Sequence, residues 1–156
     1  MSKNITAFTD KSELGRAIEG VRIEPERIVA TDSFKLIEII EHTGAEDSFT
    51  VKLPKGLKSF ERVERTEAGA YLHKGGASYS GQILHEEYPK LEGIIPTGEP
   101  NATIKLNPEF LGEICKAFTE GRAIPEMTIA YYGANKPLVF TREDGLLKAV
   151  LAPMIN

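Results

Sequence analysis

The sequence contains a single cysteine, no long apolar run and no large excess of charge of one sign. Cys115 is the only cysteine among 156 residues, which excludes an internal disulfide and suits a reducing cytoplasm. No apolar run approaches the roughly 20 residues that cross a bilayer, and the N-terminus lacks the apolar stretch of a signal peptide. The net charge of −4 argues against affinity for nucleic acid through bulk charge. We therefore expect a cytoplasmic protein without a membrane partner.

Motifs for catalysis or for binding a metal or cofactor are also lacking. Gly75 and Gly76 are not followed by the Gly-Lys-Ser/Thr of a phosphate-binding loop. Cys115 has no paired histidine motif, so core packing explains it better than a nucleophilic role. The histidines are scattered and lack the spacing of metal ligands: His42, His73 and His85. We predict that the protein is not an enzyme and needs no cofactor.

What the sequence does contain is a pattern typical of a soluble α+β protein. Hydrophobic residues make up 41% of the chain and charged residues 27%, as in a globular domain. The pattern of a strand, a helix start and three strands begins near Asn4, Ser48 and Asn101. This spacing of roughly 45–55 residues indicates an internal repeat. Amphipathic helices packed on antiparallel sheets are the predicted architecture.

The first unit is predicted to contain one short helix and several strands. Asp10 followed by Glu13 forms a capping-box pattern, and Gly20 suits the end of the helix. The apolar face of that helix would consist of Leu14, Ala17 and Ile18. An initial strand is expected near Asn4. Three further strands are predicted over Val21–Glu24, Arg27–Thr31 and residues 35–40. The Pro25-Glu26 pair separates the first of these from the second.

The second and third units carry clearer turn and cap signals. Residues 49–53 alternate as a strand, and Pro54 is expected to open a short helical turn that carries Leu57 and Phe60. Hairpins are predicted at residues 74–76, 133–136 and 144–145. Asn107 is a suitable N-cap and Pro108 a suitable first residue for a helix that ends at Gly121. The apolar stripe of that helix comprises Phe110, Leu111, Ile114, Cys115 and Phe118.

Three short segments together resemble motifs of the bacterial sliding clamp family, the β subunit of DNA polymerase III. They are residues 30–36 (ATDSFKL), residues 88–96 (YPKLEGIIP) and residues 151–156 (LAPMIN). The resemblance covers nearly the whole chain and corresponds to a middle clamp domain plus the final half of a last domain. It implies a DNA-clamp-like fold of repeated units, with residues 1–96 forming a domain of two units and residues 97–156 a third unit.

The resemblance also implies a binding pocket for short peptides of polymerase or repair proteins. Such a pocket needs apolar concavity and a few polar backbone groups. The residues at the matching positions are Thr31, Ser33, Phe34, Lys35, Leu36, Pro89, Gly93, Ile94, Pro153, Met154 and Ile155. Several depart from the family pattern, since Lys35 replaces an arginine, Ser33-Phe34 replace Gly-His, Glu92-Gly93 replace an Arg-Arg pair and Ile155-Asn156 replace Arg-Leu. Ordinary core packing and turn chemistry also explain these residues, so both interpretations stay open.

A ring of this family holds double-stranded DNA through basic groups on its inner helices. Such groups contact phosphates without reading bases, so binding would be non-specific. The matching candidates here are Lys11, Arg16, Lys58 and Lys116, each expected to project from a helix away from its apolar stripe. The helices also carry acids, so a solvated helix face explains the same pattern.

Two functional hypotheses follow from these observations. The first is a miniature sliding clamp, a homo-oligomeric processivity factor that tethers replication proteins to DNA without enzymatic activity. The second is a stand-alone clamp-fold binding module, or a decoy encoded by a mobile element, that does not encircle DNA. We predict that the chain self-associates, because three units leave one without a mate and an apolar face or strand edge uncovered. A closed multimer is expected of the first hypothesis and a monomer or dimer of the second.

Overall fold

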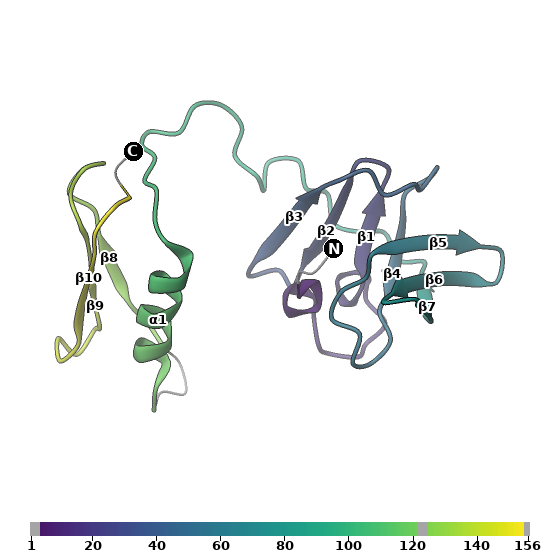
Figure 1. Ribbon diagram of the computed structural model, residues 1–156, viewed down its shortest axis with the longest axis horizontal. Helices are drawn as coiled ribbons and strands as arrows, with labels where there is room; N and C mark the ends of the chain where they lie inside the picture. The colour runs from purple at the N-terminus through teal and green to yellow at the C-terminus, as the bar shows by residue number, and fades with distance from the viewer. Residues whose placement is uncertain (1–3, 122–124, 155–156) are drawn as a thin grey trace. The chain divides into compact units, whose positions relative to one another are not determined.

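The computed structural model describes residues 4–121 and 125–154, and the chain divides into two compact units. Unit 1 comprises Met1–Ile95 and unit 2 comprises Pro96–Asn156 (Figure 1). The protein is a small α+β protein, mostly antiparallel sheet, with one α-helix among the described residues. The boundary follows Ile95, next to the predicted division after residue 96.

Antiparallel strands form one sheet in unit 1, with seven strands in its described part. They are β1 Val21–Glu24, β2 Arg27–Thr31, β3 Leu36–Ile40, β4 Phe49–Lys52, β5 Arg62–Thr66, β6 Gly69–Lys74 and β7 Ala77–Leu84. Their order is β3-β2-β1-β4-β7-β6-β5. The hairpin-linked groups β1-β2-β3 and β5-β6-β7 therefore lie on either side of β4. The predicted bounds of β1 and β2 and the turn between β6 and β7 are confirmed.

Strand β7 connects the two halves of this sheet. Its residues Ala77–Gly81 pair with β6, whereas Gln82–Leu84 pair with β4. A Cβ atom on Gly81 would lie 2.5 Å from Val51 Cγ2 and 2.8 Å from Leu72 Cδ1, closer than carbon atoms approach. Gly81 thus lets β7 run against core side chains of both neighbouring strands.

One apolar core fills unit 1 and collects residues from both halves of the sheet. It includes the fully buried side chains of Ile5, Val21, Ile23, Val51 and Leu72. Side chains of a strand alternate between its faces. Because Val21 and Ile23 enter this core, Arg22 and Glu24 lie on the opposite face, which we call the outer face.

Two predicted helical segments and one strand of unit 1 are wrong. The predicted strand near Asn4 is instead a 3₁₀ helix, η1, over Ile5–Phe8. The predicted helix from Asp10 to Gly20 is reduced to η2, a 3₁₀ turn over Ala17–Glu19. Glu13 has φ 57°, which no right-handed helix accommodates, and Leu14 is 74% exposed. Ala17 and Ile18 are buried as expected.

The predicted helical turn after Pro54 is also wrong. The backbone makes a tight turn in which Leu57 N–H donates to the carbonyl of Pro54 at 3.1 Å. Gly56 takes φ 89°, a left-handed conformation that stops a helix. Leu57 and Phe60 still enter the core, because burial of these side chains does not require helical backbone.

Unit 2 consists of α1, Pro108–Thr119, and a three-stranded antiparallel sheet of β8 Thr128–Ala130, β9 Leu138–Thr141 and β10 Lys148–Leu151 in its described part. The helix is confirmed, with the Asn107 side chain accepting from Glu109 N–H at 2.9 Å. Both hairpins are confirmed. No strand forms over residues 101–107, against expectation. Apolar side chains between α1 and the sheet form a small core: Phe118, Leu138, Phe140 and Leu151.

Candidate docking surface

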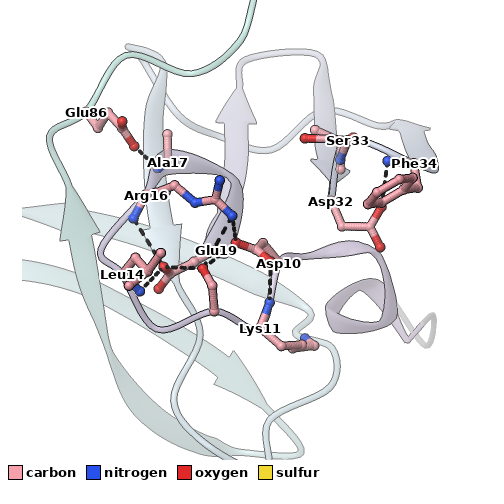
Figure 2. A network of polar contacts seen from close by, with 12 residues as sticks. Asp10, Lys11, Leu14, Arg16, Ala17, Glu19, Asp32, Ser33, Phe34 and Glu86 are labelled. Atoms are coloured by element: carbon pink, nitrogen blue, oxygen red, sulfur yellow. Dashed lines mark hydrogen bonds and ion pairs between the residues drawn. The ribbon is translucent and has the colours of Figure 1, made fainter.

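The loop between β2 and β3 is held in shape by its own polar groups (Figure 2). The Asp32 carboxylate accepts from the backbone N–H groups of Phe34 and Lys35, each at 3.0 Å, and pairs with the Lys35 ammonium. Thr31 Oγ1 donates to the Lys35 carbonyl at 2.9 Å and accepts from Ser33 N–H at 3.1 Å. Ser33 adopts φ 75° within this turn. These bonds fix a short loop without any contribution from packing of the Phe34 side chain.

Phe34 is presented to solvent by this loop. Its side chain is 97% exposed, the largest value among the exposed apolar residues of the described chain. The Lys35 ammonium, and then the two backbone N–H groups, hold the pKa of Asp32 at about 2, although partial desolvation opposes them. The carboxylate is therefore ionised at neutral pH and keeps the loop closed. An exposed aromatic ring on an ordered loop is a suitable anchor for a protein partner.

A separate apolar cluster lies beside this loop on the outer face of the sheet. It joins Leu36 to Ala17, Val29, Tyr88 and Leu91. Val29 alternates with the core residues Ile28 and Ala30 along β2, which places the cluster on the face opposite the main core. The segment after β7 thus folds back over β2 and β3. Two of the three sequence segments that resemble clamp motifs meet here.

The other predicted pocket residues are distributed as follows. Thr31 is buried, and Ser33 and Lys35 belong to the loop. Pro89, Gly93 and Ile94 are exposed on the segment that follows Tyr88. Pro153 and Met154 lie in unit 2, where Pro153 is half-buried and Met154 exposed, and Ile155 falls outside the described residues.

A charged hollow of about 370 Å³ borders the apolar cluster and shares Tyr88 and Leu91 with it. Two of its basic side chains are paired with acids, since Arg27 contacts Glu24 at 2.6 Å and Glu38 at 2.8 Å, and Arg22 contacts Glu24 at 3.6 Å. Burial raises the pKa of the Tyr88 hydroxyl to about 12, although a contact with the Thr31 backbone opposes this shift. The Tyr88 hydroxyl is therefore neutral, and the Tyr88 side chain packs in the apolar cluster of the outer face.

Glu19 organises the segment before β1, a role that sequence analysis missed. Its side chain is 1% exposed and pairs with Lys52 Nζ at 2.6 Å. The same carboxylate accepts from the backbone N–H groups of Leu14 at 2.5 Å and Arg16 at 3.2 Å (Figure 2). Lys52, foremost, and these N–H groups lower the pKa of Glu19 to about 2 against the effect of burial. Its capture of two backbone donors gives the physical reason why no α-helix forms over residues 10–20.

The four predicted DNA-contacting residues do not share a set of helices. Lys116 lies on α1, but Lys11, Arg16 and Lys58 lie on irregular backbone, so their predicted helical position is wrong. Arg16 is ion-paired with Asp10, and Lys11 Nζ donates to Thr9 Oγ1 at 2.9 Å. Lys11 and Lys58 line one hollow of about 340 Å³ in unit 1.

Neither a metal-ligating cluster nor a membrane-spanning helix occurs in the described part of the chain. Within residues 4–121 and 125–154, no three side chains of His, Cys, Asp or Glu are grouped as a metal site would require. No helix in the same residues has the length and apolar character needed to cross a membrane.

Neither a protein-family model nor a curated protein matches this chain. The resemblance to sliding clamps therefore stays a prediction based on three short segments.

Proposed function

We propose that the chain is a non-enzymatic docking module that binds a short apolar segment of a partner protein. The observation that carries this proposal is the ordered loop that exposes Phe34 beside the apolar cluster of the outer face. A stand-alone clamp-fold module, or a decoy of clamp traffic, has this character. The clamp-like fold and the link to DNA replication are part of the proposal.

The chemistry of the surface favours a peptide over a small polar ligand. Phe34 and the exposed Ile94 supply apolar area, and Leu36 is half-buried between the loop and the cluster. Peptide sites of this kind combine a few apolar anchors with polar backbone groups at the rim. A small number of anchors usually carries most of the binding energy.

Peptide titration of the full chain tests the proposal. The probe is a synthetic peptide with a glutamine followed by aliphatic and aromatic anchors, and a scrambled peptide serves as its control. We expect weak binding that Phe34→Ala reduces by about 1–3 kcal/mol, the loss expected of an anchor. Leu14→Ala is the matched control, because Leu14 is also an exposed apolar residue of unit 1 but belongs to another loop. Isothermal titration calorimetry gives the affinities.

Two results would contradict this function. One is equal binding of the probe and the scrambled peptide. The other is an unchanged affinity in Phe34→Ala. Met154→Ala, measured in parallel, reports separately whether unit 2 contributes to the same site.

A second candidate function, a ring-shaped DNA tether, is favoured by two observations. Lys11 and Lys58 line the same hollow, together with the acids Asp10, Glu13 and Glu19, and the hairpin-linked groups β1-β2-β3 and β5-β6-β7 lie on either side of β4. The net charge of −4 opposes DNA binding by a single copy, so affinity should require several copies around one channel.

Salt dependence of DNA binding tests this second candidate. Each lost phosphate contact should lower the slope of log affinity against log salt by about 0.9. We expect Lys11→Gln with Lys58→Gln to flatten the slope and Lys148→Gln, an exposed lysine of β10, to leave it unchanged. Fluorescence anisotropy with duplex DNA gives the slope, and no binding at low salt would exclude the tether.

A further inference from the structure

Strand β3 is an edge of the seven-stranded sheet, and the hydrogen-bond pattern shows which of its backbone groups are free of β2. Glu41 N–H donates to the Glu26 carbonyl at 3.1 Å, and Asp32 N–H donates to the Lys35 carbonyl at 3.3 Å. The β2–β3 register, Arg27 opposite Ile40 through Thr31 opposite Leu36, continues both pairs. Hydrogen-bonded pairs alternate with non-hydrogen-bonded pairs in an antiparallel ladder. Ile37 and Ile39 therefore bond to β2.

The backbone groups of the remaining β3 residues consequently point away from the sheet. These residues are Leu36, Glu38 and Ile40. Unpaired N–H and C=O groups in a row are a template for another strand. Their side chains lie on the outer face, because the alternating residues Ile37 and Ile39 pack with the core.

The two edge strands of the sheet differ in the charge of their exposed side chains. Strand β5, the opposite edge, carries the exposed charged residues Arg62, Glu64 and Arg65. Charges of this kind keep an edge strand from adding another chain. Strand β3 has the sequence LIEII, and its one acid, Glu38, is paired with Arg27 at 2.8 Å. The β3 edge thus lacks the protection that β5 has.

We propose that β3 pairs antiparallel with β3 of a second copy of this chain, forming a two-fold symmetric dimer through a continuous sheet. The occupant is a second copy because the edge complements itself. Phe34, 97% exposed, precedes the strand, and Ile40, 73% exposed, ends it. A two-fold axis that relates two antiparallel β3 strands places the Phe34 end of each copy against the Ile40 end of the other.

Charge selects the register of this pairing. A register centred on Glu38 would set two like charges opposite each other, which destabilises a strand pair. A register centred on Ile37 sets Glu38 opposite Leu36 of the partner subunit and brings Ile40 beside the loop that carries Phe34 of the partner subunit. The second register covers both exposed apolar residues, so a second copy and a docked peptide compete for Phe34, and this is the register we assign.

Sedimentation equilibrium of the full chain over a concentration series tests the dimer. We expect a monomer–dimer equilibrium that Ile40→Lys weakens at least tenfold, because it adds a charge to the edge. Leu14→Lys is the matched control, since Leu14 is similarly exposed but lies away from β3. Phe34→Ser, in a loop that keeps its polar contacts, provides a second variant that should also weaken the dimer. Circular dichroism confirms that each variant is folded.

Disulfide trapping tests the register. In a Cys115→Ser background, the pair Phe34→Cys and Ile40→Cys should cross-link two copies on mild oxidation, and Glu38→Cys alone should not. Three results overturn the inference: a wild-type chain that is monomeric at every concentration, association that Ile40→Lys leaves unchanged, or preferential cross-linking through position 38. A peptide titration on the Ile40→Lys monomer keeps the docking function and the dimer experimentally separate.

Discussion

Single residues decide the two local structures that matter most in unit 1. Asp32 closes the β2–β3 loop by accepting from two backbone N–H groups, and so Phe34 is exposed rather than packed. The Glu19 carboxylate accepts from the backbone N–H groups of Leu14 and Arg16, and these residues form an irregular segment where a helix was predicted. In both places a carboxylate accepts from backbone N–H groups, and for Asp32 this is the competition with backbone pairing that short polar side chains offer in turns.

The ionisation of Glu19 should make stability depend on pH. Its pKa is lowered from 4.5 to about 2 in the folded protein, so the ionised form is favoured by folding. A lowered pKa adds stability that is complete above the unfolded value and is lost as pH falls through the folded value. We expect the wild-type melting temperature to fall from about pH 5 down to about pH 2, partly through this group.

Thermal melts of wild type and Glu19→Gln across that pH range check the expectation. Glutamine keeps an oxygen for the N–H groups of Leu14 and Arg16 but removes the charge that pairs with Lys52. The variant should be less stable at neutral pH, and its curve should converge with that of wild type near pH 2. Parallel curves would show that Glu19 does not contribute to the pH dependence. Asp32, with a similarly lowered pKa, accounts for part of the remaining slope.

At the scale of elements, most strands and the capped helix α1 were predictable, whereas two helical segments and two strands were predicted wrongly. The bounds of β1 and β2 match the prediction because Pro25-Glu26 separates two apolar runs, and Asn107-Pro108 marks the start of α1. These signals are local, since each depends on the conformational preferences of one or two residues. The two missing helices had apolar residues at helical spacing, but burial of Leu57 and Phe60 is achieved by an irregular chain that follows the sheet.

The junction of β7 with β4 and β6 provides a prediction at this scale. Gly81→Ala should destabilise unit 1 by about 1–3 kcal/mol, the usual cost of overpacking. The new methyl group would collide with Val51 and Leu72, which are fully buried and have no room to move. Urea denaturation followed by circular dichroism measures the loss.

Gly112→Ala is the control for this substitution. Gly112 lies on α1 with no atom within 4 Å of the added methyl group, so alanine should be tolerated there or stabilise the helix. An equal free energy of unfolding for Gly81→Ala and wild type would contradict this close approach of β7 to Val51 and Leu72.

At the scale of the whole molecule, two units each build a core of their own residues. The core of unit 1 joins both halves of a sheet, and that of unit 2 joins one helix to a three-stranded sheet. Apolar residues remain exposed in both, including Phe34 and Ile40 in unit 1 and Tyr132 and Leu146 in unit 2. In unit 1, Phe34 and Ile40 flank β3, and both the docking and the dimer proposals are built on this edge of the sheet.

The sequence by itself determined the strands bounded by proline or glycine and the capped helix α1. These depend on local backbone preferences, which a single sequence carries. Tertiary structure decided the rest. Glu19 forms an ion pair with Lys52 of β4, which is distant in the chain. Strand β7 pairs with β4 along one part and with β6 along the other, and β3 lies at an edge of the sheet. Such outcomes depend on contacts between residues far apart in the chain. These contacts override local propensity, because burial and paired charge contribute more free energy to folding than helix propensity does.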